Sequence, residues 1–297
     1  MASGTIDTLA PGLRRIIAPN PSPMTERGTN TYLLGGAAGL CVIDPGPMDE
    51  NHLAGILEAI GTARVDAIVV THAHLDHAPL ARTLAEATGA EVLAFGDAET
   101  GRSTIMRELA AEGRVGGGEG VDAAFHPDRT VADGDVIEGP GWRLEVLHTP
   151  GHMGNHICLR WGDALFTGDH VMGWASSLVS PPDGDLTDFM RSCRRLRGLG
   201  SRVGYAGHGA PMEDPMGRID WLIRHREARE AAIVAALRAA GAPLDATGIA
   251  EAVYADVPPG LRAAAERNVL AHLVDLTGRG RAAPEGPLSA TARFRPI

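Results

Sequence analysis

Residues 67–77 gather side chains that commonly bind metal ions. In this segment, AIVVTHAHLDH, three histidines and an aspartate fall within six residues, directly after an apolar run typical of a buried strand. The loop after a strand end can fold so that side chains two, four and five residues apart converge. A neutral imidazole offers one nitrogen lone pair and a carboxylate adds negative charge, so the segment suits divalent ions. We therefore expect four ligands here: His72, His74, Asp76 and His77.

Three further candidate ligands follow later strand-like runs, each beside glycine. His152 lies in TPGHMGNH, Asp169 in LFTGDH and His208 in AGHGAP. Glycine lets the backbone turn sharply and approach its neighbours closely. Together the candidates make five histidines and two carboxylates, which exceeds the four ligands of one tetrahedral ion. They fit two ions that share a carboxylate.

Two such ions would make the protein a dinuclear metal-dependent hydrolase. A water molecule between two cations loses its proton near neutral pH, and the resulting metal-bridging hydroxide is the nucleophile. The ions also polarise the scissile carbonyl or phosphoryl oxygen, so the substrate is an ester, thioester, lactone or phosphodiester. Histidine and carboxylate ligands without a thiolate accept zinc, iron or manganese, and of these we expect zinc. A serine hydrolase is not indicated, since the chain has no GxSxG segment.

The elements that must position these residues form an α/β core. Short apolar, β-branched runs recur from Leu13 to Val203 and predict strands, and helical periodicity appears between them, at 49–61, 78–89 and 187–199. Two of the runs, ICLRW and ALF, are joined by Gly162 and Asp163, which is the turn signal of an antiparallel hairpin. The sheet is therefore predicted to be mixed.

The last quarter of the chain has a different composition. Residues 225–297 hold nine arginines against eight acids, which leaves 18 basic and 29 acidic residues upstream. Alanine-rich helical segments are predicted at 226–240, 245–254 and 260–276, followed by the turn-rich TGRGRAAPEG. Three helices and a glycine-arginine hairpin indicate a winged helix. We predict two domains, a catalytic domain at 1–224 and a winged-helix-like domain at 225–297.

The order of the motifs THAHLDH, HTPGH, FTGD and GHG resembles the metallo-β-lactamase superfamily over residues 30–210. The resemblance implies an αββα sandwich. It also implies that His72, His74 and His152 bind one ion, that Asp76, His77 and His208 bind the other, and that Asp169 bridges them. On this reading the residues nearest the chemistry are Asp76, His152 and Asp169.

Four more residues are candidates to orient the ligands or the substrate. The resemblance places Asp44, in VIDPGP, near the site, and Asn30, in GTNTYLLG, close to the substrate. His156 and His170 flank ligand positions, so each could orient a ligand or protonate a leaving group. A structural histidine and a turn asparagine are the alternatives, and an ordinary turn aspartate is the alternative for Asp44.

The C-terminal half is similar to the β-lactamase-like protein 2 branch of the superfamily, some members of which cleave single-stranded RNA. A single-strand-specific endoribonuclease is therefore an alternative function, with RNA in place of a small-molecule substrate. A basic helix-and-wing face would support it, although these arginines could instead pair with Glu266 and Asp275: Arg262, Arg267, Arg279 and Arg281. A non-catalytic winged-helix regulator is disfavoured, because no candidate ligand is missing.

Composition bounds the partners. The formal net charge is −10 and aromatic residues make up 4% of the chain, which disfavours a broad nucleic-acid surface. The sequence begins without an apolar leader and contains no apolar stretch long enough to span a bilayer, so we expect a cytoplasmic protein with no membrane partner. The pattern leaves both a monomer and a homodimer open.

Overall fold

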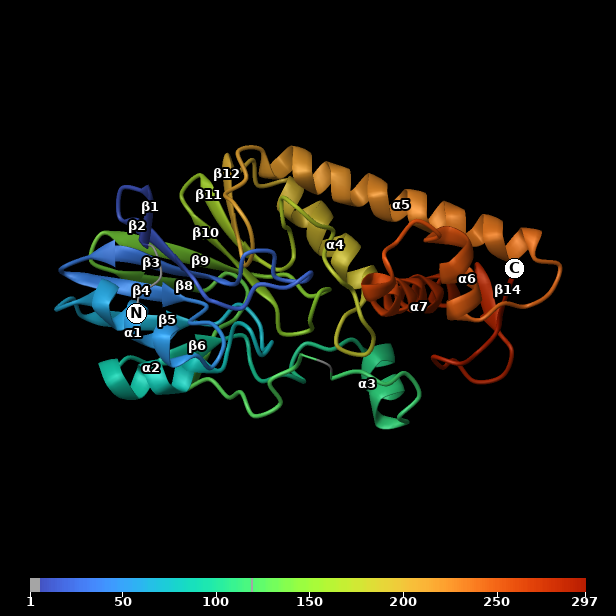
Figure 1. Ribbon diagram of the computed structural model, residues 1–297, viewed down its shortest axis with the longest axis horizontal. Helices are drawn as coiled ribbons and strands as arrows, with labels where there is room; N and C mark the ends of the chain where they lie inside the picture. The colour runs from blue at the N-terminus through green and yellow to red at the C-terminus, as the bar shows by residue number, and fades with distance from the viewer. Residues whose placement is uncertain (1–5, 119) are drawn as a thin grey trace.

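A computed structural model describes residues 6–118 and 120–297 (Figure 1). In the described part, the first sheet has seven strands in sequence order: β1 Ile6–Ala10, β2 Leu13–Ile17, β3 Asn30–Gly36, β4 Gly39–Ile43, β5 Val65–Val69, β6 Val92–Ala94 and β7 Arg129–Thr130. Strands β1 to β4 pair antiparallel, whereas β4 to β7 pair parallel. The predicted mixed sheet is confirmed.

A second sheet faces the first. Its order is β12 Val203–Ala206, β11 Ala164–Gly168, β10 Ile157–Trp161, β9 Trp142–His148 and β8 Val136–Gly139. Strands β10 and β11 form the predicted hairpin, in which Trp161 pairs with Ala164 and Gly162 takes a φ of 56°. At one edge of this sheet, β11 and β12 pair parallel.

Helices cover the outer faces of both sheets (Figure 1). Helices α1 Glu50–Ile60 and α2 Leu80–Thr88 pack on the first sheet, while α4 Leu186–Arg197 and the first part of α5 Pro215–Ala239 pack on the second. Along β4, Leu40 and Val42 face the helices, while Cys41 and Ile43 face the other sheet. Burial on both faces explains the unbroken apolar runs of the sequence. The αββα sandwich is confirmed.

The C-terminal region forms the predicted helical unit with a small wing. It contains α6 Ala246–Val253, the 3₁₀ turn Pro259–Leu261, α7 Arg262–Gly278 and the antiparallel pair β13 Ala282–Pro284 and β14 Phe294–Pro296. Helix α5 begins eleven residues before the expected Arg226, because Asp214 caps it and Pro215 starts it. The predicted boundary at 224/225 thus falls inside α5, and it stays a prediction.

Several short elements have weak sequence signals. Helix α3 Thr104–Ala111 is eight residues long, and β7 has two residues. Strand β2 carries two adjacent arginines, and buried Arg15 pairs with Asp7 of β1 at 2.6 Å. Their formation depends on tertiary contacts more than on local pattern.

Helix α3 belongs to the core of the C-terminal unit. Its Met106 and Leu109, with the following Val115, are buried against apolar residues of α5, α6 and α7. Ala290, in the loop of the wing, donates its backbone N–H to the Arg114 carbonyl at 2.8 Å. The segment that contains α3 and the C-terminal unit therefore share a hydrophobic core.

Five of the strands that end at one edge of the sandwich are followed by loops with candidate site residues. Strands β4 and β5 are parallel and end there together. In the second sheet, β9 and β11 both run antiparallel to β10, and β12 runs parallel to β11, so these three also end on one side. The loops after β5, β9, β11 and β12 carry the candidate ligands, and the loop after β4 carries Asp44.

Replacing Leu109 with Ala should lower the free energy of unfolding by about 2–5 kcal/mol, because the change leaves a cavity in the shared core. Ile105 lies in the same helix with 37% of its surface exposed, so Ile105→Ala is the matched control and should change stability far less. Denaturant unfolding of the full chain measures both. Equal effects of the two substitutions would contradict the shared core.

Candidate metal centre

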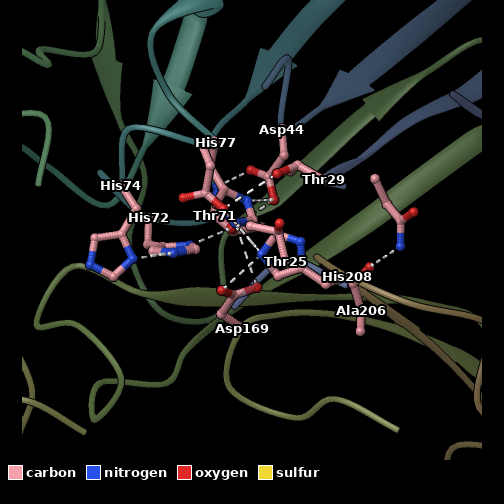
Figure 2. Close-up of polar contacts among 12 residues, drawn as sticks. Thr25, Thr29, Asp44, Thr71, His72, His74, His77, Asp169, Ala206 and His208 are labelled. Carbon is pink, nitrogen blue, oxygen red and sulfur yellow. Dashed lines mark hydrogen bonds and ion pairs between the residues drawn. The ribbon is translucent and has the colours of Figure 1, made fainter. Parts of the chain in front are cut away.

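Three histidines bring one ring nitrogen each to a common point. His74 Nδ1 lies 3.0 Å from His72 Nε2 and 3.1 Å from His152 Nε2. His72 and His74 follow β5 of the first sheet, whereas His152 follows β9 of the second, so the group joins the two sheets. Figure 2 shows His72 and His74 directed at each other. We call these three residues the first group.

A second group lies beside the first. Asp76 Oδ2 is 3.3 Å from His77 Nε2 and 3.1 Å from His208 Nε2. Asp169 Oδ2 is 3.3 Å from His208 Nε2 and 3.8 Å from His152 Nε2, which places Asp169 between the groups. All seven candidate ligands from the sequence are thus brought together.

Asp44 orients two of the imidazoles, His77 directly and His72 through Thr71 (Figure 2). Its Oδ2 accepts hydrogen bonds from the Thr71 hydroxyl at 2.8 Å and from His77 Nδ1 at 3.0 Å, and its Oδ1 accepts the Thr71 N–H at 2.7 Å. Because the Thr71 hydroxyl donates to Asp44, its oxygen accepts from His72 Nδ1 at 3.0 Å. His72 and His77 therefore carry a proton on Nδ1, which leaves Nε2 as the atom of each ring that can bind a metal ion.

Backbone carbonyls orient two other rings. His152 Nδ1 donates to the Leu178 carbonyl at 2.7 Å, and His208 Nδ1 donates to the Gly28 carbonyl at 3.2 Å. Their Nε2 atoms face the centre of the site. Ring nitrogens that converge at 3.0–3.4 Å, as in these two groups, repel unless a proton or a metal ion lies between their lone pairs, so the donor set fits a metal ion.

A buried oxygen of Asp169 supports the same fit. Asp169 Oδ1 lies 3.5 Å from His77 Nε2 and accepts no hydrogen bond within the described residues. A buried polar atom without a hydrogen-bond partner is costly, and a cation would satisfy it. The atom points into the second group.

Burial keeps the imidazoles of the first group neutral. It lowers the pKa of His74 to about 3. It also lowers the pKa of His72 well below the usual range, with His77 and His74 adding to the effect, and lowers the pKa of His152. Neutral imidazole is the form that binds metal.

In the second group, carboxylates outweigh burial. Burial alone would lower the pKa of His208, but mainly Asp169 raises it to about 9. The pKa of His77 is raised against burial by Asp76 and Asp169. Burial would raise the pKa of Asp169, yet His208 and His77 bring it well below the usual range. The carboxylates are therefore ionised, and a divalent ion would have to displace imidazole protons to bind.

The two flanking histidines lie in different surroundings. His156 Nε2 accepts the backbone N–H of Asp169 at 3.2 Å, so it contacts a candidate ligand directly. The ring of His170 packs on Phe189 at 4.4 Å, and its Nε2 is 3.5 Å from Cys193 Sγ. Within the described residues, no hydrogen bond joins His170 to either group. Only His156 is thus placed to orient a ligand.

Asn30 supports the loop that carries His208. It is 1% exposed, and its Nδ2 donates to the Ala206 and Gly209 carbonyls at 3.0 and 2.9 Å. These carbonyls stand on either side of His208. Its polar contacts are therefore with these carbonyls and with the Tyr32 hydroxyl at 3.2 Å, and its proximity to a substrate stays a prediction.

Sequence reasoning missed three residues that shape the centre. Thr71 is the first residue of the THAHLDH motif. Its position directly before His72 could have indicated that its hydroxyl contacts that ring. Leu178 acts through its backbone carbonyl, which leaves no signal in the sequence. A Cβ at Gly207 would lie 2.3 Å from Asp169 Oδ1 and 2.6 Å from His77 Cε1, so this position requires glycine.

Comparisons with known proteins agree with this geometry. The sequence pattern of the Metallo-beta-lactamase superfamily matches residues 24–208, and that of the Beta-lactamase associated winged helix domain matches residues 246–287. Among solved structures, the chain is similar to a metallo-beta-lactamase family protein from Thermus thermophilus, at 29% identity and a TM-score of 0.77. That similarity covers 98% of this chain and 100% of the other.

Two curated relatives are similar over most of the chain. A Beta-lactamase-like protein 2 homolog of Drosophila melanogaster is 30% identical over 93% of this chain and 91% of its own length. The Atrochrysone carboxyl ACP thioesterase of Aspergillus fumigatus is 32% identical over 78% of this chain and 67% of its own length. Across the described residues, every helix is too short or too polar to cross a membrane.

Replacing Gly207 with Ala should weaken divalent-ion binding about tenfold or more, because the added methyl group displaces Asp169 or His77, and such overpacking costs about 1–3 kcal/mol. Gly36→Ala is the matched control, since a Cβ there meets no atom within 4 Å. Zinc titration against a chromophoric chelator measures both variants. Wild-type affinity in Gly207→Ala would show that Gly207 does not constrain the centre.

Proposed function

The chain belongs to the metallo-β-lactamase superfamily, and from that premise we propose that it is a dinuclear metal-dependent hydrolase of apolar acyl thioesters or esters. The single observation that carries the proposal is the pair of convergent ligand groups joined by Asp169. In this assignment the ligands of one zinc ion are His72, His74 and His152. Those of the other are Asp76, His77 and His208, with Asp169 shared. When bound, two such ions lower the pKa of water and polarise the scissile carbonyl.

Asp76 is the member of the second group that reaches solvent. Its side chain is 27% exposed, compared with 9% or less for His77, His208 and Asp169. Its Oδ2 faces the two imidazoles, so Oδ1 is the atom that can accept a proton from water and return it to the leaving group. Asp76 therefore orients the reacting water in this proposal.

Apolar side chains beside the ligands favour an apolar acyl group. Leu75, which stands between two ligands, is 51% exposed, and Trp174 is 38% exposed. Trp174 lies against Gly209, next to His208, since a Cβ at Gly209 would lie 2.6 Å from Trp174 Cδ1. Exposed apolar side chains at a site mark a surface for an apolar partner. The fungal relative named as an acyl carrier protein thioesterase is consistent with this substrate class.

Three of the four candidate arginines do not favour RNA. Arg279 pairs with Asp275 and Glu230 at 2.5 Å each, and Arg281 pairs with Glu230. Arg267 donates to Ser180 Oγ at 2.7 Å and to two backbone carbonyls. The sequence offered Glu266 and Asp275 as partners for these arginines, and of the two it is Asp275 that pairs with an arginine, Arg279. Arginines that already pair with carboxylates and backbone carbonyls are poor contacts for phosphate groups. This supports an acyl ester or thioester over a phosphodiester as the substrate.

Metal analysis of zinc-replete protein should give about two ions per chain, because seven ligand residues exceed the four of one tetrahedral ion. Asp169→Ala should lower metal content and hydrolysis together, since Asp169 contacts both groups. Asp220→Ala, in the exposed part of α5, is the control and should change neither. A content that never exceeds one ion, or full activity in Asp169→Ala, would refute the dinuclear assignment.

Acyl thioesters with long apolar chains should be hydrolysed faster than short-chain esters, lactones or single-stranded RNA in a substrate panel. In the RNA arm, Arg279→Ala with Arg281→Ala tests the wing directly. Each phosphate contact contributes about 0.7 to the salt slope for a single strand, so two lost contacts would flatten the slope by roughly one unit. We expect an unchanged slope. A flattened slope together with RNA cleavage would favour the endoribonuclease.

A further inference from the structure

We propose that the C-terminal winged-helix unit positions the ring of His152 through the single peptide group that joins Leu178 to Val179. This peptide group contacts the ring nitrogen that faces away from the candidate metal centre. The unit supplies none of the candidate ligands, yet it contacts the segment on which His152 depends. The inference rests on the proposed assignment of His152 as a metal ligand. It adds two positioning residues, Asn268 of α7 and Arg226 of α5, to the residues that build the centre.

The ring of His152 has one hydrogen bond on its outer side. Its Nδ1 donates to the Leu178 carbonyl at 2.7 Å, and this bond places the lone pair of Nε2 toward His74. Leu178 lies in the irregular segment between β11 and α4, so no strand or helix fixes its carbonyl. The direction of that carbonyl must therefore be set by other contacts.

The same peptide group is held on its opposite side by the C-terminal unit. The carbonyl of Leu178 and the N–H of Val179 belong to one planar amide, so they cannot turn independently. The Val179 N–H donates to Asn268 Oδ1 at 3.3 Å. Fixing the N–H thus fixes the carbonyl that His152 uses.

Arg226 holds this arrangement together. It is 2% exposed, and its guanidinium donates to Asn268 Oδ1 at 2.8 Å and to the Ser177 carbonyl. Within the described residues, Arg226 has no carboxylate partner, so its buried charge is directed at these oxygens. Arg267 donates to Ser180 Oγ at 2.7 Å. Helices α5 and α7 therefore hold the segment immediately before and after the peptide group.

Contacts between the two units also exist away from this segment. Thr187 Oγ1, at the start of α4, donates to Asp275 Oδ1 of α7 at 2.7 Å. This bond helps docking but does not touch residues 177–180. It provides a matched comparison between general docking and the specific support of His152.

The test measures zinc affinity in the full-length protein by competition with a chromophoric chelator, and the absorption spectrum of the cobalt-substituted protein. Asn268→Ala should weaken the binding of one of the two ions about tenfold, the lower end of the range for groups that support ligands, and should alter the cobalt spectrum. Asn268→Ser should do the same, because a serine hydroxyl is too short to reach Val179, and it serves if the alanine variant does not fold. Asn268→Asp keeps the acceptor oxygen and should stay within twofold of the wild type.

Thr187→Val is the docking control and should also stay within twofold. Wild-type affinity for both ions in a folded Asn268→Ala or Asn268→Ser variant would overturn the inference, as would an equal loss in Thr187→Val. His152→Ala separates this inference from its premise. If that variant binds both ions normally, the ligand assignment itself fails and the inference fails with it.

Discussion

The centre depends on hydrogen bonds to the ring nitrogens that face away from it. Four of the five candidate histidine ligands donate Nδ1–H to a fixed acceptor, which is a hydroxyl, a carboxylate or a backbone carbonyl. Each bond sets the orientation of its ring and places a proton on Nδ1, so that Nε2 is the atom directed at its group. Converging lone pairs and buried carboxylates are unfavourable by themselves, and the folded scaffold must hold them in place. Asp44 and the contacts from the C-terminal unit both contribute to holding these rings in place.

Asp44 shows how the backbone contributes. It adopts a φ of 51°, a conformation that is uncommon for a residue with a side chain and costs about 1–3 kcal/mol. Three hydrogen bonds to Thr71 and His77 offset this cost. The turn directs the carboxylate across to the loop after β5, which lies parallel to β4 in the same sheet. One strained residue at a strand end therefore supports ligands of both groups.

The C-terminal unit is integrated with the αββα sandwich rather than attached through a linker. Helix α5 runs continuously from the second sheet into the winged helix, and α3 of the first half completes the C-terminal core. Contacts from α7 reach residues 179 and 180 beside the candidate metal centre. A change in the C-terminal core can therefore affect the geometry of the candidate ligands, although every one of those ligands lies before residue 209.

The sequence by itself determined the strand runs, the hairpin at Gly162, the family resemblance and the seven residues that converge. Those features depend on local periodicity, on turn chemistry and on residue types with few other uses, all of which are visible in one dimension. Tertiary structure alone decided which nitrogen each imidazole presents, because the tautomer depends on partners as distant as Gly28 and Leu178. It also separated His156, which contacts Asp169, from His170, which packs against Phe189, although both flank ligand motifs. The pairing of Arg279 with Glu230 was likewise hidden, because a charge in a sequence does not reveal its partner until helices from different segments meet.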